Sequence, residues 1–228
     1  MARKEMAKAD CRYCNQQFTT ISMSKHLNSC PKHKVAIEKA EKSKLEAENL
    51  YYLRVIEPYQ KDFWLDLEMR GAAKLDDLDF YLRKIWLECC GHLSEFSSKG
   101  WGSAKISMSH KADAIFRKYD QLTHIYDFGS SSETLIKLMG VRQGKPLSKH
   151  PIELMARNLM PQIPCIECDE ISKWLCMDCL YESEKGGLVC QKHYKKHKSH
   201  DENGEPLELV NSPRLGTCGY DGPAEPPY

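Results

Sequence analysis

Residues 63–86 read FWLDLEMRGAAKLDDLDFYLRKIW, a strand pattern followed directly by a helix pattern. The first part alternates with a period of two, which is typical of a half-buried strand, through Phe63, Leu65, Leu67 and Met69. The second part has helical spacing in its apolar residues, which are Leu75, Leu78, Leu82, Ile85 and Trp86. Asp76, Asp77 and Asp79 fall in its first turns, where the helix dipole favours acidic side chains. We expect a strand and then one long helix that packs on the sheet.

Further strand patterns follow this helix along the chain. They are Leu93–Phe96, Lys105–Met108, Thr123–Phe128, Thr134–Val141 and Ile152–Arg157, with a short helix at Lys111–Phe116. Short strands that follow one another with brief connections favour antiparallel pairing. The sequence therefore predicts an α+β fold, whose core domain over residues 58–160 is a mostly antiparallel sheet with the long helix packed on it.

The chain has 228 residues, of which 41% are hydrophobic and 29% charged, an ordinary globular composition. No apolar run exceeds four residues, which excludes a transmembrane helix, and the N-terminus lacks the apolar stretch of a secretory signal. We therefore expect a cytoplasmic protein in a reducing compartment. In such a compartment, 11 Cys and 9 His indicate metal binding and not a disulfide scaffold.

Residues 1–33 have the ligand spacing of a ββα zinc finger of the C2HC type. The four donors, Cys11, Cys14, His26 and Cys30, would place one pair on a hairpin knuckle and the other one turn apart on a helix. Phe18 and Met23 would supply the small apolar core, and Ser22 or Ser24 could cap the helix. His33 is the alternative fourth ligand, but the spacing from His26 to Cys30 closes one helical turn better.

A second Cys/His cluster lies in residues 161–203 and has eight donors in four pairs. Interleaved pairing predicts a cross-brace with two zinc ions. One ion would be held by Cys165, Cys168, Cys190 and His193, and the other by Cys176, Cys179, His197 and His200. Since the stretch has few aliphatic residues, metal binding would substitute for a hydrophobic core. With the finger, this predicts three zinc ions, all structural because every coordination position is filled by protein.

Three cysteines remain outside these clusters. Cys89 and Cys90 precede His92 at the end of the predicted long helix, where buried thiols are the expected interpretation. Cys218 lies in a Gly-rich tail and has no His or Cys within two or three residues. We expect these residues to be bystanders to metal binding.

The net charge of +1 conceals a basic N-terminal segment. Residues 1–44 carry a net charge of +6, and the remaining residues carry −5. Residues 34–57 are rich in helix formers and predict a charged, mostly exposed linker helix that ends before Pro58. A basic finger and helix are compatible with a phosphate backbone as partner, through Arg12, Lys25, Lys32 and Lys34. A solvated helix face is the alternative explanation of the charges.

Several pieces of residues 60–222 resemble a known family. They are Phe63–Met69, Leu75–Trp86, the run GHLSEF at 91–96, YDFGS at 126–130, MARN at 155–158, VNSPR at 210–214 and CGY at 218–220. Together they look like the plasmid ORF-three-like family of the Ri-plasmid type, in the subgroup with a Cys-rich zinc insert. The resemblance implies an α+β domain without an established activity, and a bacterial, archaeal or mobile-element context. It does not extend to the N-terminal finger, which is an added module.

The leading functional prediction is a non-enzymatic zinc protein that contacts nucleic acid through its finger and linker helix. The alternative is a protein–protein adaptor acting through the cross-brace, which resembles B-box and ZZ-type modules. A third class is an enzyme built on the α+β core, with Asp127, Arg157 or Arg214 in a pocket, although no nucleophile is placed beside a base. Residues 204–228 predict a short strand at Leu207–Val210 and a Gly/Pro-rich tail that returns to the core.

Overall fold

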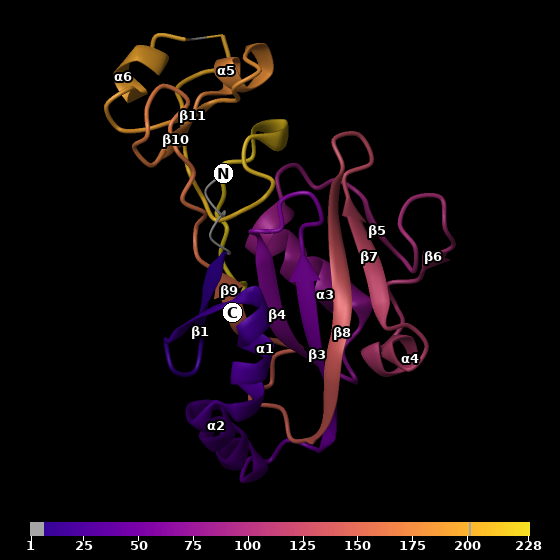
Figure 1. Ribbon diagram of the computed structural model, residues 1–228. Coiled ribbons are helices and arrows are strands. Elements are labelled where there is room, and N and C mark those ends of the chain that lie inside the picture. The colour runs from indigo at the N-terminus through magenta and orange to yellow at the C-terminus, as the bar shows by residue number, and fades with distance from the viewer. Residues whose placement is uncertain (1–6, 201) are drawn as a thin grey trace.

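The computed structural model describes residues 7–200 and 202–228, so Arg3 and Lys4 of the basic segment lie outside the described residues. Its main feature is an antiparallel nine-stranded sheet with the strand order β2-β1-β9-β4-β3-β8-β7-β5-β6 (Figure 1). These strands are β1 (Lys8–Cys11), β2 (Gln17–Thr19), β3 (Glu48–Ile56), β4 (Trp64–Arg70), β5 (Ser94–Ser97), β6 (Lys105–Ile106), β7 (Gln121–Tyr126), β8 (Ser132–Gly144) and β9 (Ile152–Asn158). The α+β prediction with a mostly antiparallel sheet is confirmed, and each predicted strand of the core is present with slightly shifted ends.

The remaining elements are short. The helices are α1 (Thr20–Ser29), α2 (Pro31–Glu41), α3 (Leu75–Leu82), the π-helical turn η1 (Arg83–Leu87), α4 (Ala112–Phe116), α5 (Met177–Glu182), α6 (Tyr194–His197) and the 3₁₀ turn η2 (Thr217–Gly219). A second sheet has the order β11-β10-β12, from β10 (Trp174–Leu175), β11 (Leu188–Val189) and β12 (Leu207–Glu208). The expected long helix is therefore an eight-residue α-helix that continues as a π-helical turn. Among the described residues, no helix combines the length and apolar character needed to cross a membrane.

Strand β4 separates two hydrophobic cores. Leu65, Leu67 and Met69 face the main core, which they share with the apolar residues of α3 and η1. Trp64, on the opposite face, belongs to a second core shared with the finger residues Met23 and Leu27. The alternation in β4 therefore reflects burial on both faces, and the prediction of a half-buried strand is wrong in this respect.

The prediction of a linker helix over residues 34–57 is wrong for the second half of this range. Helix α2 ends at Glu41, and residues 48–56 form β3, which pairs with β4 on one side and β8 on the other. Local helix propensity is weak compared with the burial of Leu50, Leu53 and Val55 in the middle of a sheet. The chain from finger to core is therefore a short helix followed by a central strand.

The finger and the C-terminal tail are both tied to other parts of the molecule. Strand β1 pairs with β9, so the finger extends the core sheet. Strand β12 pairs with β10 of the insert, so the predicted C-terminal strand completes the insert and does not return to the core. The tail after it does return, since Ser212 Oγ donates a hydrogen bond to the carbonyl oxygen of Trp86. Figure 1 shows the insert as a separate lobe above the sheet.

Candidate metal centres

The four predicted finger donors lie together at one end of α1. Cys11 ends β1, Cys14 follows in the turn, His26 lies in the last turn of α1, and Cys30 caps that helix. Their ligand atoms are all within 4.8 Å of one another, and Cys14 Sγ lies 3.3 Å from His26 Nε2. Burial raises the pKa of Cys11 to about 11, because a buried thiolate is unfavourable. A bound cation would offset this free-energy cost by stabilising the thiolate.

The surroundings of this cluster follow the predicted finger core, with one difference in the helix cap. Phe18 stacks on the His26 ring at a centroid distance of 3.8 Å. Thr19, and not Ser22 or Ser24, caps α1 by accepting a hydrogen bond from the backbone N–H of Ser22. The alternative ligand His33 lies outside the cluster, since its Nδ1 is 3.0 Å from the Leu27 carbonyl oxygen and its ring stacks on Tyr13.

The insert brings its eight donors together in the interleaved arrangement that the spacing predicts. One cluster contains Cys165, Cys168, Cys190 and His193, and the other contains Cys176, Cys179, His197 and His200. In the first cluster, His193 Nδ1 lies 3.5 Å from both Cys165 Sγ and Cys190 Sγ. In the second cluster, the Cys179 sulfur lies 3.2 Å from His197 Nδ1. Each set could hold a metal ion, and all eleven cysteines are free of disulfides.

Glu167 connects the two clusters of the insert. It lies between the donors Cys165 and Cys168 in the sequence, yet its Oε1 is 2.6 Å from Nε2 of His197 in the other cluster. Hydrogen bonds from Lys196 and His197 lower the pKa of Glu167 to about 2, so the carboxylate is ionised. A carboxylate on the second ring nitrogen orients a histidine whose first nitrogen binds metal. This contact supports Nδ1 of His197 as a metal donor.

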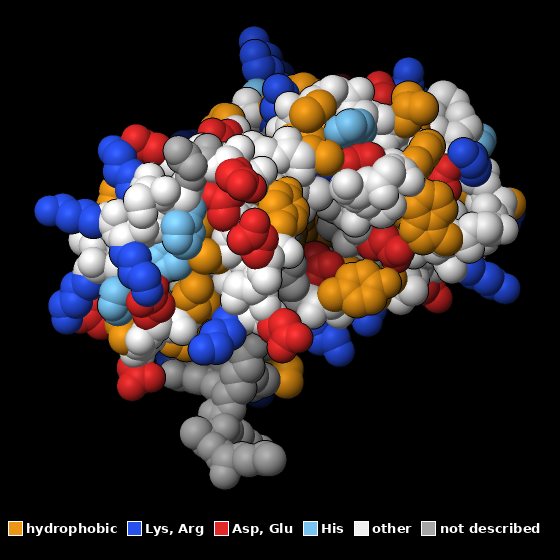
Figure 2. All heavy atoms as spheres, turned by 90° about the horizontal axis from the view of Figure 1, so that it is seen from above, with side chains coloured by type: hydrophobic (Ala, Val, Ile, Leu, Met, Phe, Trp, Pro, Cys, Tyr) orange, Lys and Arg blue, Asp and Glu red, His pale blue; other side chains and the backbone are white. Residues whose placement is uncertain are grey.

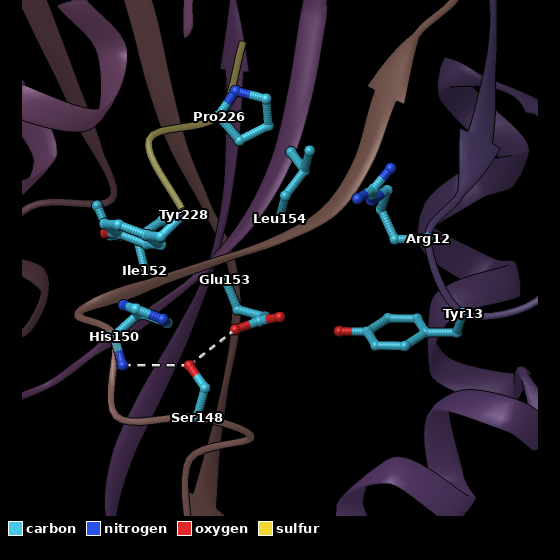
Figure 3. Close-up of a pocket in the computed structure, with 9 residues that line it drawn as sticks. All are labelled: Arg12, Tyr13, Ser148, His150, Ile152, Glu153, Leu154, Pro226 and Tyr228. Carbon is cyan, nitrogen blue, oxygen red and sulfur yellow. Dashed lines mark hydrogen bonds between the residues drawn. The ribbon is translucent and has the colours of Figure 1, made fainter. Parts of the chain in front are cut away.

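The four residues predicted to contact nucleic acid are all exposed. Lys25 lies on α1, and Lys32 and Lys34 lie on α2. Arg12 lies in the knuckle between Cys11 and Cys14, and lines a cavity of about 280 Å³ with Tyr13, His150 and Tyr228 (Figure 3). In this cavity the His150 and Tyr228 rings stack at 4.2 Å, and Glu153 accepts a hydrogen bond from Ser148. Its lining mixes charges of both signs and has no donor set for a metal.

A fourth cluster contains two cysteines that the sequence predicts to take no part in metal binding. The ligand atoms of Cys89, His92 and Cys218 all lie within 4.8 Å of one another. Cys89 is only half-buried and its neighbour Cys90 is exposed, so the prediction that these two thiols are buried is wrong. The clue in the sequence was the Cys-x2-His spacing of residues 89–92, but its partner lies 126 residues beyond His92 and only the folded tail brings it near.

Two residues named for a hypothetical enzyme pocket also lie at this fourth cluster. Asp127 accepts a hydrogen bond from Nη2 of Arg214 at 2.6 Å, whereas Arg157 lies elsewhere and binds the Asn211 carbonyl oxygen. Burial disfavours the Asp127 carboxylate, but hydrogen bonds from Arg214 and the following backbone lower its pKa to about 2. Burial likewise opposes the Cys89 thiolate, but hydrogen bonds from Arg214 and Tyr126 lower its pKa below the ordinary value.

Comparison with known proteins gives little to set beside this geometry. No protein-family model and no curated protein matches the chain. A solved structure with a similar chain trace is the crystal structure of a protein of unknown function, MM3350, from Methanosarcina mazei Go1. It has 14% sequence identity and a TM-score of 0.42, and the match covers 70% of this chain and 94% of that chain. The likeness to the plasmid ORF-three-like family stays a prediction.

Proposed function

We propose that this chain is a non-enzymatic, zinc-binding interaction protein. One zinc ion would stabilise the finger, and two would stabilise the insert. The spacing of the donor atoms carries the proposal. A tetrahedral zinc ion separates a sulfur and a nitrogen ligand by about 3.6 Å, and two sulfur ligands by about 3.8 Å. In the insert, Cys190 Sγ lies 3.5 Å from His193 Nδ1 and 3.7 Å from Cys168 Sγ.

The small core of the insert supports a structural role for these ions. Among the described residues, its buried hydrophobic cluster contains Cys165, Val189 and Cys190, with a few half-buried neighbours. Such a core is too small to fold a lobe, and metal binding supplies the missing free energy. Each set has four protein donors, which leaves no position for a substrate.

Metal content measured on single variants tests this arrangement. Cys14→Ser, Cys168→Ser and Cys179→Ser each remove one donor from a different cluster, so each variant should contain one zinc ion fewer than the wild-type chain. Cys90→Ser is the matched control, because Cys90 is exposed and belongs to none of the four clusters. An unchanged zinc content in any of the three variants would contradict the corresponding site.

We further propose nucleic acid as the partner of the finger and α2. Lys25, Lys32 and Lys34 are exposed, and no ion pair between described residues neutralises them. The pairing of β1 with β9 fixes these side chains relative to the core, so that several could contact one phosphate backbone together. On the face shown in Figure 2, by contrast, basic and acidic side chains are interspersed among the coloured residues.

An electrophoretic titration with a short DNA duplex and a single-stranded RNA tests this partner. The wild-type chain should bind weakly and with a steep salt dependence. The variant Lys25→Ala/Lys32→Ala/Lys34→Ala should bind less tightly, and each lost phosphate contact should reduce the salt slope by about 0.9 on duplex DNA. The control Lys61→Ala/Lys99→Ala/Lys149→Ala removes three exposed charges of the core and should leave binding unchanged. The absence of binding at low salt would contradict the proposal.

A protein partner is the second candidate, because the insert exposes large apolar side chains. Leu180 and Tyr181 on α5 are 38% and 64% exposed. Tyrosine is one of the residue types enriched among those that anchor protein interfaces. Pull-down after nuclease treatment should then recover the same protein with the wild-type chain and not with Leu180→Ser/Tyr181→Ser. Equal recovery with both chains would exclude α5 as the contact.

A further inference from the structure

We propose that Cys89, His92 and Cys218 form a fourth metal site, for a thiophilic divalent cation such as Zn²⁺, with one coordination position open to an external ligand. The site shares no donor with the finger or insert clusters, so this proposal does not depend on the proposed function. It lies where the loop after η1, the end of β7 and the C-terminal tail meet.

The donor set suits such a cation. Two sulfurs and an imidazole nitrogen lie within 4.8 Å of one another, and this mixture selects zinc-like ions over magnesium or calcium. His92 Nε2 is shielded from solvent and makes no hydrogen bond with any described residue, although it lies only 3.6 Å from the Asp127 carboxylate. A buried polar atom without a partner carries a free-energy cost, which coordination to a metal would remove.

The charges around the site also suit a divalent cation. The guanidinium of Arg214 is fully buried, and its charge is balanced by Asp127. Its Nη2 also lies 3.4 Å from Cys89 Sγ and 3.7 Å from Cys218 Sγ. One hydrogen of Nη2 is donated to Asp127, and the other can be donated to a thiolate that binds metal. With Asp127 and Arg214 paired, the two thiolates would neutralise the divalent ion.

The backbone is held in an unfavourable conformation at this site. Asp127 has φ 65° and Cys218 has φ 53°, and the one other non-glycine residue with positive φ in the described chain is Asn15 beside the finger donor Cys14. Such conformations persist only where the surrounding structure enforces them. Here the tail is fixed by Arg214, whose Nη1 donates to the Ser130 carbonyl oxygen at 2.8 Å. The fold therefore positions Cys218 at the cluster against local backbone preference.

The fourth site differs from the other three in ligand number and exposure. Each of the others has four protein donors, whereas this one has three. Cys218 is exposed and about a third of the His92 side chain is accessible, so solvent reaches the site. Three protein donors with an accessible remaining position are typical of zinc sites that bind an external ligand or water.

Cobalt titration of the full chain tests the proposal. The protein is kept reduced with a phosphine and dialysed against a chelator, and Co²⁺ is then added while visible absorption is recorded. The wild-type chain should take up one equivalent more than Cys218→Ser or His92→Ala, with thiolate-to-cobalt charge-transfer absorption. Cys90→Ser, which removes the neighbouring exposed thiol, should take up the same amount as the wild-type chain. Added azide should shift the spectrum of the extra equivalent if a position is open.

The possible outcomes are distinct. Equal uptake by the wild-type chain and both donor variants would overturn the site, and a spectrum insensitive to azide would overturn the open position. Circular dichroism recorded before the chelator step shows whether each variant is folded. Because the readout is a difference of one equivalent, it does not depend on how many ions the other three clusters hold.

Discussion

Glu167 links the two Cys/His clusters of the insert, since it follows Cys165 of one cluster in the sequence and contacts His197 of the other. Its carboxylate is ionised and hydrogen-bonded to Nε2 of His197. Removing such an orienting carboxylate typically reduces metal affinity by about 10–100-fold. We predict that Glu167→Ala weakens zinc binding by the cluster of Cys176, Cys179, His197 and His200 by this factor, as measured by competition with a chromophoric chelator.

Glu170 offers the matched control for this prediction. It is exposed and pairs with Lys192 at the surface, and among the described residues it makes no hydrogen bond or ion pair with His197. Its side chain interacts with Cys190 of the other cluster, so the control applies to the cluster of Cys176, Cys179, His197 and His200, whose zinc affinity Glu170→Ala should leave unchanged. An equal loss in both variants would show that general surface charge, and not orientation of His197, determines the affinity.

Asp79 gives a prediction about acid stability. Burial disfavours its carboxylate, but hydrogen bonds from His124 and Ser94 lower its pKa below the ordinary value of 3.8. A carboxyl group whose pKa is lower in the folded than in the unfolded state stabilises the fold above its unfolded pKa and loses this effect as pH falls. We predict that the wild-type chain exceeds Asp79→Asn in unfolding free energy at pH 6, and that this difference shrinks below about pH 4.

Urea unfolding at several pH values measures this difference. Loss of metal in acid affects both chains equally and cancels. Asp76→Asn, which changes an exposed carboxylate of the same helix, should have little effect at any pH. A difference for Asp79→Asn that does not change with pH would mean that the carboxylate is not linked to folding.

At the residue scale, the sequence predicted what short spacings determine and missed what the tertiary fold determines. Cys11 and Cys14 are three positions apart in one knuckle, so their spacing alone predicts that both are donors to the same metal ion. Cys218 and His92 are 126 residues apart, and no local pattern relates them. The sequence suggests Asp127 and Arg214 only as candidates for an enzyme pocket, and their ion pair is visible only in the fold.

At the scale of elements, β3 and β4 are joined by a buried ion pair that also holds the finger. Arg54 donates two hydrogen bonds to Asp66, and its Nη1 donates to the Thr20 carbonyl oxygen at the start of α1. Breaking a buried pair by removing one partner costs about 3–5 kcal/mol, because the other charge is left uncompensated. We predict a loss of unfolding free energy of this size for Arg54→Ala, measured by urea denaturation.

The double variant Arg54→Met/Asp66→Leu separates charge from packing. It removes both charges and fills much of their volume, so it should lose less stability than Arg54→Ala. If the double variant is the less stable of the two, the uncompensated charge of Asp66 is not the main cause of the loss. Because both variants lose the hydrogen bond from Arg54 to the Thr20 carbonyl oxygen, hydrogen exchange in α1 should increase in both.

The same elements show where sequence patterns fail. The period of two in β4 was identified correctly, but alternation cannot distinguish a strand with one wet face from one with two different cores. The residues that lead up to β3, and Glu48 at its start, favour a helix. The pairing of β3 with β4 and β8 overrides that preference. A strand that gains its stability from neighbours distant in sequence is the kind of element that local propensity misses.

At the scale of the whole molecule, metal removal should unfold the structure in parts. The main core extends over β3, β4, α3 and their neighbours and contains none of the finger or insert donors. The insert has almost no core of its own, and the finger core depends on Cys11 and Cys30 as well as on Met23 and Leu27. We predict that a strong chelator removes amide exchange protection from β10, β11 and α1 while β4 stays protected.

Hydrogen exchange with mass spectrometry, with and without chelator, measures this prediction. Strand β1 is the informative element, because it carries Cys11 but also pairs with β9. If the sheet stabilises β1 without metal, its protection survives with that of β9, and the finger unfolds only from the knuckle to α2. If β1 and β9 lose protection together, zinc in the finger stabilises one edge of the core sheet. Loss of protection in β4 would show that the core sheet cannot stay folded without metal.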